Sequence, residues 1–123
     1  ATLTSLIYNT QQLPLGAALN TIVWQGVLNG GIVQFQIATA CKPGQGTVPN
    51  CTGGVLGWNF VGPGGTSIDY YQGGPDTSIV IPRTGTGEHN NKQYIRYKVF
   101  LATDGSANPP GPIIRDIATN WSL

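Results

Sequence analysis

Apolar and polar residues alternate with a period of two along much of the chain, and the helical period of about 3.6 residues is almost absent. The alternation is clearest in residues 94–101, where Ile95 and Val99 share one face with other apolar residues. Arg96 and Lys98 fall on the opposite face. A helix would scatter these charges around its circumference, whereas a strand has one buried face and one mostly wet face. The pattern therefore predicts a strand.

Other segments show the same alternation or are rich in β-forming residues. The predicted strands, in chain order, are residues 3–10, 21–28, 32–40, 56–60, 68–72, 78–82, 94–101 and 113–123. Two of them are separated by Asn29-Gly30-Gly31, a sequence typical of a tight turn with positive φ. We therefore predict a β-hairpin over residues 20–40.

The segments between the predicted strands are rich in turn-forming residues. They include Gly- and Pro-containing runs at residues 62–65, 73–76, 84–87 and 108–112. No helix of significant length fits between them. About eight short strands in 123 residues predict an all-β fold with one domain over residues 1–123, an antiparallel β-sandwich or jelly roll.

The chain carries few charges, and this excludes some classes of function. Only 9% of residues are charged, and six Lys and Arg face five Asp and Glu, for a net charge of +1. Six scattered cations do not form the basic patch of a nucleic-acid-binding protein. No apolar run approaches the length of about 18 residues that a membrane span needs. Met is absent, so we expect a processed or excised product, with a signal peptide or a membrane anchor as the candidate for what preceded Ala1.

Two cysteines, Cys41 and Cys51, flank a loop rich in Gly and Pro. A disulfide across the base of this loop would indicate an oxidising, extracytoplasmic compartment. The alternative is a pair of free thiols. A zinc site is not indicated, because the chain has one His and no second Cys pair.

The residues that catalysis requires are few and dispersed. His89 lies in a polar, Asn-rich turn, and we interpret it as a surface or capping residue with a side chain within reach of a neighbouring strand. No carboxylate lies in a recognisable catalytic motif, and no Ser lies in a nucleophile elbow. We therefore expect no enzymatic activity and no cofactor. Bound calcium is a lesser hypothesis, with Asp69, Asp76 and Asp116 as its candidate ligands.

Aromatic residues indicate a second kind of site. Exposed rings can stack on the apolar faces of sugars, and the candidates here are Trp58, Tyr70 and Tyr71. Tyr70 and Tyr71 are adjacent, so in a strand one of them must point outward. The alternative is that Trp58 belongs to the core and that the tyrosines cover an edge of the sheet.

Several segments in this order resemble the soluble domains of type IV pilin-like surface proteins of small uncultivated bacteria, and more loosely the jelly-roll modules of secreted bacterial proteins. The segments are residues 6–10, 20–26, 33–41, 89–99 and 112–122. The resemblance implies an extracellular, non-catalytic sandwich. It further implies structural roles for six residues: Trp24, Phe35, Tyr97 and Trp121 in the core, and Cys41 with Cys51 as a loop staple. The hydrophobic N-terminal helix of a pilin is not present in this sequence.

These observations together predict a structural or adhesive domain at the cell surface, a pilin-like or filament subunit. Its expected partners are like subunits or other surface proteins, and residues 1–9 are expected to pair with a partner as an added strand. A polar surface with few charges suits such packing, because burying charge is costly. The alternative function is a carbohydrate-binding module.

Overall fold

A computed structural model describes residues 1–12, 15–42, 44, 57–103 and 111–122. Its strands are β1 (Thr2–Thr4), β2 (Tyr8–Asn9), β3 (Ala18–Val27), β4 (Ile32–Ala40), β5 (Tyr71–Gln72), β6 (Ile79–Val80), β7 (Tyr94–Ala102) and β8 (Ile113–Ser122). The part of the chain that the structure describes contains no helix, and so none that is long and apolar enough to cross a membrane.

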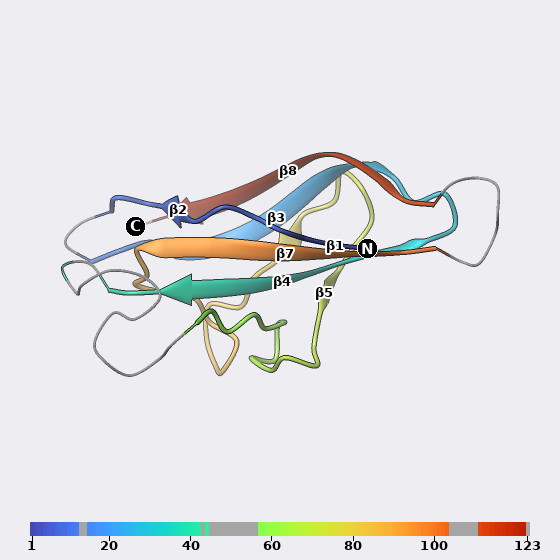
Figure 1. The fold of residues 1–123 in the computed structure, drawn as a ribbon. Helices are drawn as coiled ribbons and strands as arrows, with labels where there is room; N and C mark the ends of the chain where they lie inside the picture. Colours follow the sequence, from blue (N-terminus) through green and yellow to red (C-terminus); the bar gives the residue numbers. More distant parts are fainter. Residues whose placement is uncertain (13–14, 43, 45–56, 104–110, 123) are drawn as a thin grey trace.

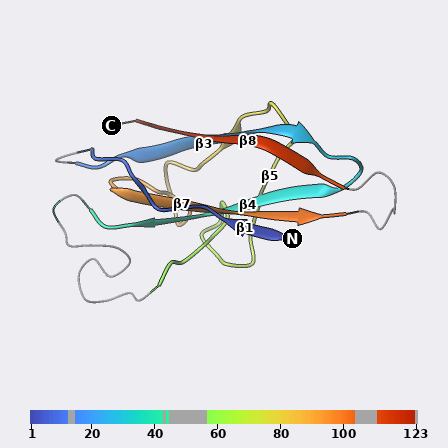
Figure 2. The same ribbon diagram turned by 45° about the horizontal axis from the view of Figure 1, so that its top comes forward.

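The strands form two antiparallel sheets. The larger sheet has the order β1-β7-β4-β5, and β2 pairs with β7 next to β1. The smaller sheet has the order β6-β3-β8. Figures 1 and 2 show the two sheets as layers, with β3 and β8 over β4 and β7. The predicted all-β, antiparallel sandwich is thereby confirmed.

The core lies between the layers and is built mainly from residues of the long strands, with Tyr71 and Ile81 added from the segment between β4 and β7. Its fully buried members include Leu19, Ile22, Trp24, Val33, Phe35, Ile37, Tyr71, Ile81 and Val99. The Trp24 indole Nε1–H donates to the Gly73 carbonyl oxygen at 2.9 Å, so the largest core side chain leaves no buried donor unpaired. Trp24 and Phe35 are core residues, as expected.

The predicted hairpin over residues 20–40 is wrong, because β3 and β4 belong to different sheets. The tight turn itself is present: Asn29 and Gly30 have positive φ, and the Gly31 N–H donates to the Leu28 carbonyl oxygen at 2.8 Å. Each strand has one strongly apolar face. Because the turn carries the chain from one layer to the other, those two faces meet across the core instead of lying side by side in one sheet.

The predicted strand at residues 3–10 is divided into β1 and β2 by Ser5. The Ser5 hydroxyl accepts a hydrogen bond from the Tyr97 N–H at 2.9 Å, while the Ser5 N–H donates to the Tyr97 carbonyl oxygen at 2.9 Å. The side chain thus takes the place of a backbone acceptor in the ladder. The two residues that follow, Leu6 and Ile7, are exposed between the two short strands.

Three of the predicted strands are shorter than expected or missing. Residues 68–72 and 78–82 are reduced to the two-residue strands β5 and β6. Residues 57–60 form no strand, and Leu56 lies outside the described residues. Val61 alone makes a bridge, with reciprocal backbone hydrogen bonds of 2.9 Å to Ile37. The expected number of eight strands is reached because one predicted strand divides and another is absent.

The expected strict alternation in β8 is interrupted by a bulge. Gln25 pairs with Asp116 but Gly26 pairs with Ile114, so Arg115 is the extra residue. The bulge turns both Ile114 and Ile117 toward the core, although strict alternation would place them on opposite faces.

Two residues that the resemblance assigned to the core lie nearer the surface. Trp121, near the end of β8, retains 37% of its surface exposed and is not a core residue. Tyr97 is only half-buried. Trp121 lies on β8, an edge strand of the smaller sheet, and Tyr97 lies on β7 of the larger sheet.

Candidate functional site

His89 is buried instead of lying on the surface as expected, with 5% of its area exposed. Its Nδ1 lies 2.7 Å from the Thr39 hydroxyl on β4, so the side chain does reach a neighbouring strand. Its Nε2 has no partner among the described residues. Burial lowers the pKa of His89 to about 4; Glu88 opposes this shift, and Lys92 adds to it. His89 is therefore neutral at physiological pH and lies between the sheets.

The three calcium candidates lie on separate elements. Asp69 precedes β5, Asp76 is in the turn between β5 and β6, and Asp116 is on β8. The Asp69 carboxylate accepts backbone N–H donors from Gly64 and Tyr70 and so stabilises its own loop. Within the described ranges, no three His, Cys, Asp or Glu side chains gather into a group that could hold a metal ion.

The predicted disulfide falls partly outside the described residues. Cys41 follows β4, is buried, and has a positive φ of 57°. Cys51 lies outside the described residues. The Cys41–Cys51 bond therefore stays a prediction.

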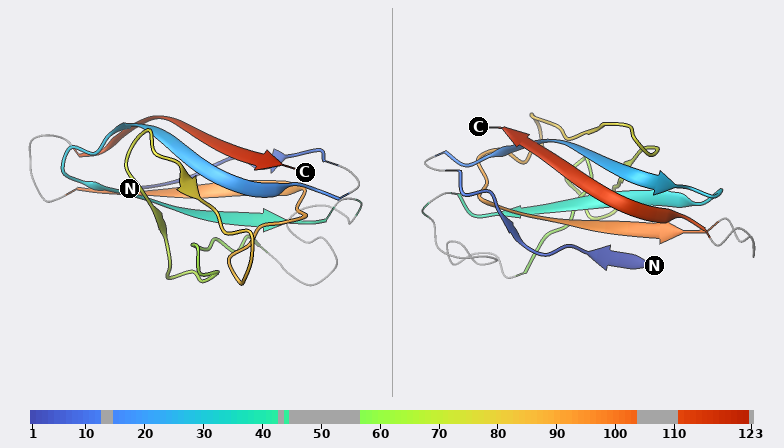
Figure 3. Two further views of the ribbon diagram at one scale, coloured as in Figure 1. Left: turned by 180° about the vertical axis from the view of Figure 1, so that it is seen from behind. Right: turned by 90° about the horizontal axis from the view of Figure 1, so that it is seen from above.

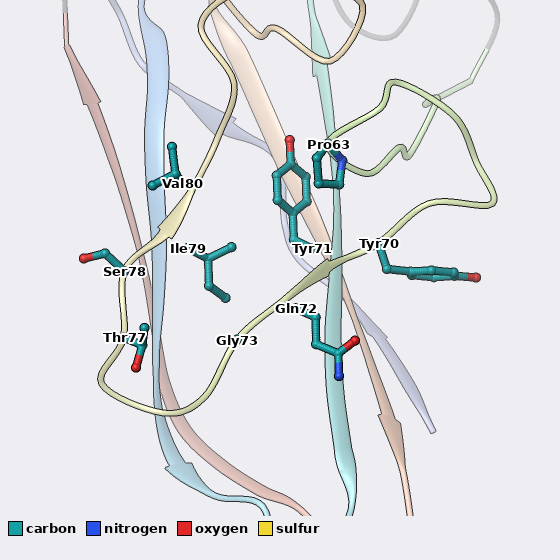
Figure 4. Close-up of a pocket in the computed structure, with 9 residues that line it drawn as sticks. All are labelled: Pro63, Tyr70, Tyr71, Gln72, Gly73, Thr77, Ser78, Ile79 and Val80. Atoms are coloured by element: carbon teal, nitrogen blue, oxygen red, sulfur yellow. The ribbon is translucent and has the colours of Figure 1, made fainter.

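The three candidate stacking aromatics do not form one platform. Tyr71 pairs with Phe35 on the inner face and is buried, and burial raises its pKa to about 12. Its hydroxyl has no partner among the described residues. Tyr70 projects outward, as Figure 4 shows. The two rings border a pocket of about 390 Å³ between β5 and β6, whose other lining residues include Thr77 and Ser78.

The outer face of the larger sheet carries an alternating series of aromatic and cationic side chains, which we call the ring–cation row. Its members are Trp58, Arg96, Phe60, Lys98, Phe100 and Tyr70. The Arg96 guanidinium carbon lies 5.5 Å from the Trp58 ring centroid and 5.9 Å from that of Phe60. The Lys98 Nζ lies 4.5 Å from the Phe60 centroid and 6.0 Å from that of Phe100. The Tyr70 ring meets Phe100 edge-on, with centroids 5.1 Å apart.

Through the row, residues 57–60 contact the outer face of the larger sheet without forming a strand. Trp58 and Phe60 pack over the cations of β7, and cation–π attraction holds them there. The outer face of β4 is covered at Gln36, because the buried Gln36 amide donates to the Ser67 and Asp69 carbonyl oxygens at 2.8 and 2.9 Å. Trp58 is therefore neither a core residue nor a free stacking surface.

A second surface feature is the side of the sandwich that is formed by β8 of the smaller sheet and by β1 and β2 of the larger sheet. We call it the open side. The smaller sheet ends at β8, whereas β1 extends the larger sheet beyond β7 (Figure 3), and β2 also pairs with β7. Leu3 pairs with Val99 and Tyr8 pairs with Ile95, so both share the inward face of these buried residues. Leu3 is nevertheless 59% exposed and Tyr8 45% exposed. No described strand of the smaller sheet covers them.

The open side also includes Leu6 and Ile7, which lie within the segment expected to pair with a partner, and Trp121, which was expected in the core. Leu6 is 80% exposed, and Ile7 and Trp121 are exposed as well. Residues 1–9 contain no charged side chain. Natural edge strands are usually protected by charges, by Pro or by a covering element, and this edge has none of these among the described residues.

In comparisons with known proteins, no family model, no curated protein and no solved structure matches the chain. The likeness to pilin-like domains therefore stays an expectation.

Sequence reasoning missed Arg96 and Lys98 as members of a surface site. The signal was available in residues 94–101, where Lys98 and Phe100 share the mostly wet face of the predicted strand.

Proposed function

We propose that the protein is a non-catalytic structural or adhesive domain at the cell surface that assembles with like subunits along its open side. The observation that carries the proposal is the edge formed by residues 1–9, which has no charged side chain and exposes four large apolar or aromatic side chains, Leu3, Leu6, Ile7 and Tyr8. Contiguous exposed apolar surface at an unprotected sheet edge favours pairing with another chain.

The geometry supports strand addition at this edge. β1 and β2 pair with β7 on one side only, so their other backbone groups are free to pair with a strand of a neighbouring subunit. Such a strand would also cover Leu6 and Ile7. A neighbouring subunit above the inward face of β1 and β2 would bury Leu3 and Tyr8, which the smaller sheet leaves uncovered.

The low charge of the chain agrees with this role. Subunits that pack closely must remove water from their contact surfaces, and ionised side chains make that removal costly. With 9% charged residues, the chain has little charged surface to desolvate.

The experiment combines sedimentation velocity over a wide range of protein concentration with negative-stain electron microscopy of the concentrated sample. We expect species larger than the 12.9 kDa monomer at high concentration, and ordered filaments in the images. The variant Leu6→Ser should weaken assembly. The matched control is Ile68→Ser, because Ile68 is 86% exposed but lies on the loop before β5.

Two results would contradict the proposal. One is a monomer at every concentration, with no filaments. The other is equal weakening of assembly by Leu6→Ser and Ile68→Ser, because general loss of apolar surface would then explain the effect.

A further inference from the structure

We propose that the ring–cation row, together with the exposed side chains beside it, is a binding site for an acidic oligosaccharide, one that carries carboxylate or sulfate groups. This inference does not rest on the assembly proposed above, because it concerns the outer face of the larger sheet; the two surfaces share only β1, through Thr2 and Thr4.

The argument begins with the different environments of the two cations. Arg96 donates from Nε and from its second terminal nitrogen to the Ser5 carbonyl oxygen, at 3.1 and 2.9 Å, and packs against Trp58 and Phe60. These hydrogen bonds and ring contacts give Arg96 a structural role, because they join β7 to Ser5 and to the loop before Val61.

Lys98 differs from Arg96, because aromatic rings contact its ammonium group but no described hydrogen-bond acceptor or anion pairs with it. It lies near the Phe60 and Phe100 rings and makes no hydrogen bond or ion pair with any described residue. An ammonium group has three N–H donors, and here they remain available for an external anion. The two rings limit the positions that the side chain can adopt, which reduces the entropy lost when an anion binds.

The groups around Lys98 suit a saccharide more than a simple ion. Thr4 pairs with Lys98 and Thr2 pairs with Phe100, so their exposed hydroxyl side chains share the outer face with the row. Tyr70 adds a partly exposed ring with a phenolic hydroxyl. Rings can pack on the CH faces of sugars while hydroxyl groups exchange hydrogen bonds with the sugar hydroxyls.

Two further residues extend this surface toward β5. Gln34 pairs with both Phe100 and Gln72, and the Gln34 Nε2 donates to the Gln72 Oε1 at 3.3 Å. Phe100, Gln34 and Gln72 therefore form a cross-strand series on the same face, beginning at Thr2. Such a surface is long enough to contact more than one sugar unit, since adjacent strands lie about 4.8 Å apart.

The test is isothermal titration calorimetry of the full chain with polygalacturonate, heparin, neutral dextran and a single-stranded oligodeoxynucleotide. We expect binding to polygalacturonate, to heparin or to both, and none to dextran. Binding to polygalacturonate alone would identify carboxylate as the recognised group, and binding to heparin alone would identify sulfate. The variant Lys98→Gln should weaken binding about tenfold, the loss expected for one hydrogen bond to a charged group.

The matched control is Arg115→Gln, which removes one positive charge from the smaller sheet and should leave binding unchanged. Tyr70→Ala is a second variant of the row, at an exposed position, and should also weaken binding; it keeps the proposal testable if Lys98→Gln does not fold. The proposal is overturned by the absence of binding to both acidic polysaccharides, by equal binding to dextran or to the oligodeoxynucleotide, or by equal losses in Lys98→Gln and Arg115→Gln.

Discussion

Acidification from pH 7.5 to pH 5 should destabilise the folded protein, because His89 lies neutral between the two sheets. The ring is buried, its Nδ1 lies 2.7 Å from the Thr39 hydroxyl, and its Nε2 has no partner among the described residues. Burial is the main cause of its lowered pKa; Glu88 acts in the opposite direction, and Lys92 lowers the pKa further.

The direction of the effect follows from proton linkage. The pKa of His89 falls from 6.5 to about 4 on folding, so between these values the unfolded chain binds more protons than the folded one. The free energy of unfolding is therefore independent of this group above about pH 6.5 and decreases as the pH falls toward 4. Each pKa unit corresponds to about 1.4 kcal/mol, so the expected loss at pH 5 is about 2 kcal/mol.

The assay is urea unfolding, followed by tryptophan fluorescence, at several pH values between 7.5 and 5. The comparison variant is His89→Asn, whose shorter side chain can still hydrogen-bond the Thr39 hydroxyl but does not titrate. We expect the variant to be less stable than the wild type at pH 7.5 and to change much less between pH 7.5 and pH 5. A wild type with the same stability at both pH values would refute the reasoning, and so would a variant with an equal pH dependence.

Two further predictions concern single positions in the sandwich. Gly26 has a φ of +152° at the bulge, and a Cβ there would lie 1.9 Å from the Ile113 carbonyl oxygen, so Gly26→Ala should lower the free energy of unfolding by at least about 2 kcal/mol. Gly85→Ala is its control, because Gly85 also has positive φ but open space around it; an equal loss in both variants would show that the close contact does not matter. Tyr71→Phe removes a buried hydroxyl without a described partner and should raise the thermal unfolding midpoint, by the equivalent of about 1 kcal/mol; a lower midpoint would mean that the hydroxyl is satisfied.

The candidate sites could be anticipated only in part. The sequence singled out Trp58, Tyr70 and Tyr71 as candidate stacking aromatics, but Tyr71 is buried and the cations near the other two lie on β7. Arg96 and Lys98 lie more than 25 positions from Tyr70 in the sequence. Only the folded sheet brings these cations to the Trp58 and Phe60 rings and places Tyr70 against Phe100 on the same face. For His89, the neighbouring Asn residues indicated a surface turn, whereas packing against β4 and the start of β3 buries it.

The sequence by itself determined the strand character of β3, β4, β7 and β8 and the inward face of the first three. Alternation is a local property: Ile22 and Trp24, or Val33 and Phe35, must share one face of any strand that contains them. It also determined the tight turn after Leu28, because Asn and Gly tolerate positive φ at low cost.

Only the tertiary structure decided which strands pair. The turn at Asn29 and Gly30 reverses the chain whether its strands join one sheet or two, so the outcome depended on distant partners, β8 for β3 and β7 for β4. The bulge at Arg115 likewise exists only because β8 is paired with β3, where it brings Ile114 and Ile117 to the core together. Pairing between residues far apart in the chain is governed by the total apolar surface that the fold buries, and no local pattern contains that quantity.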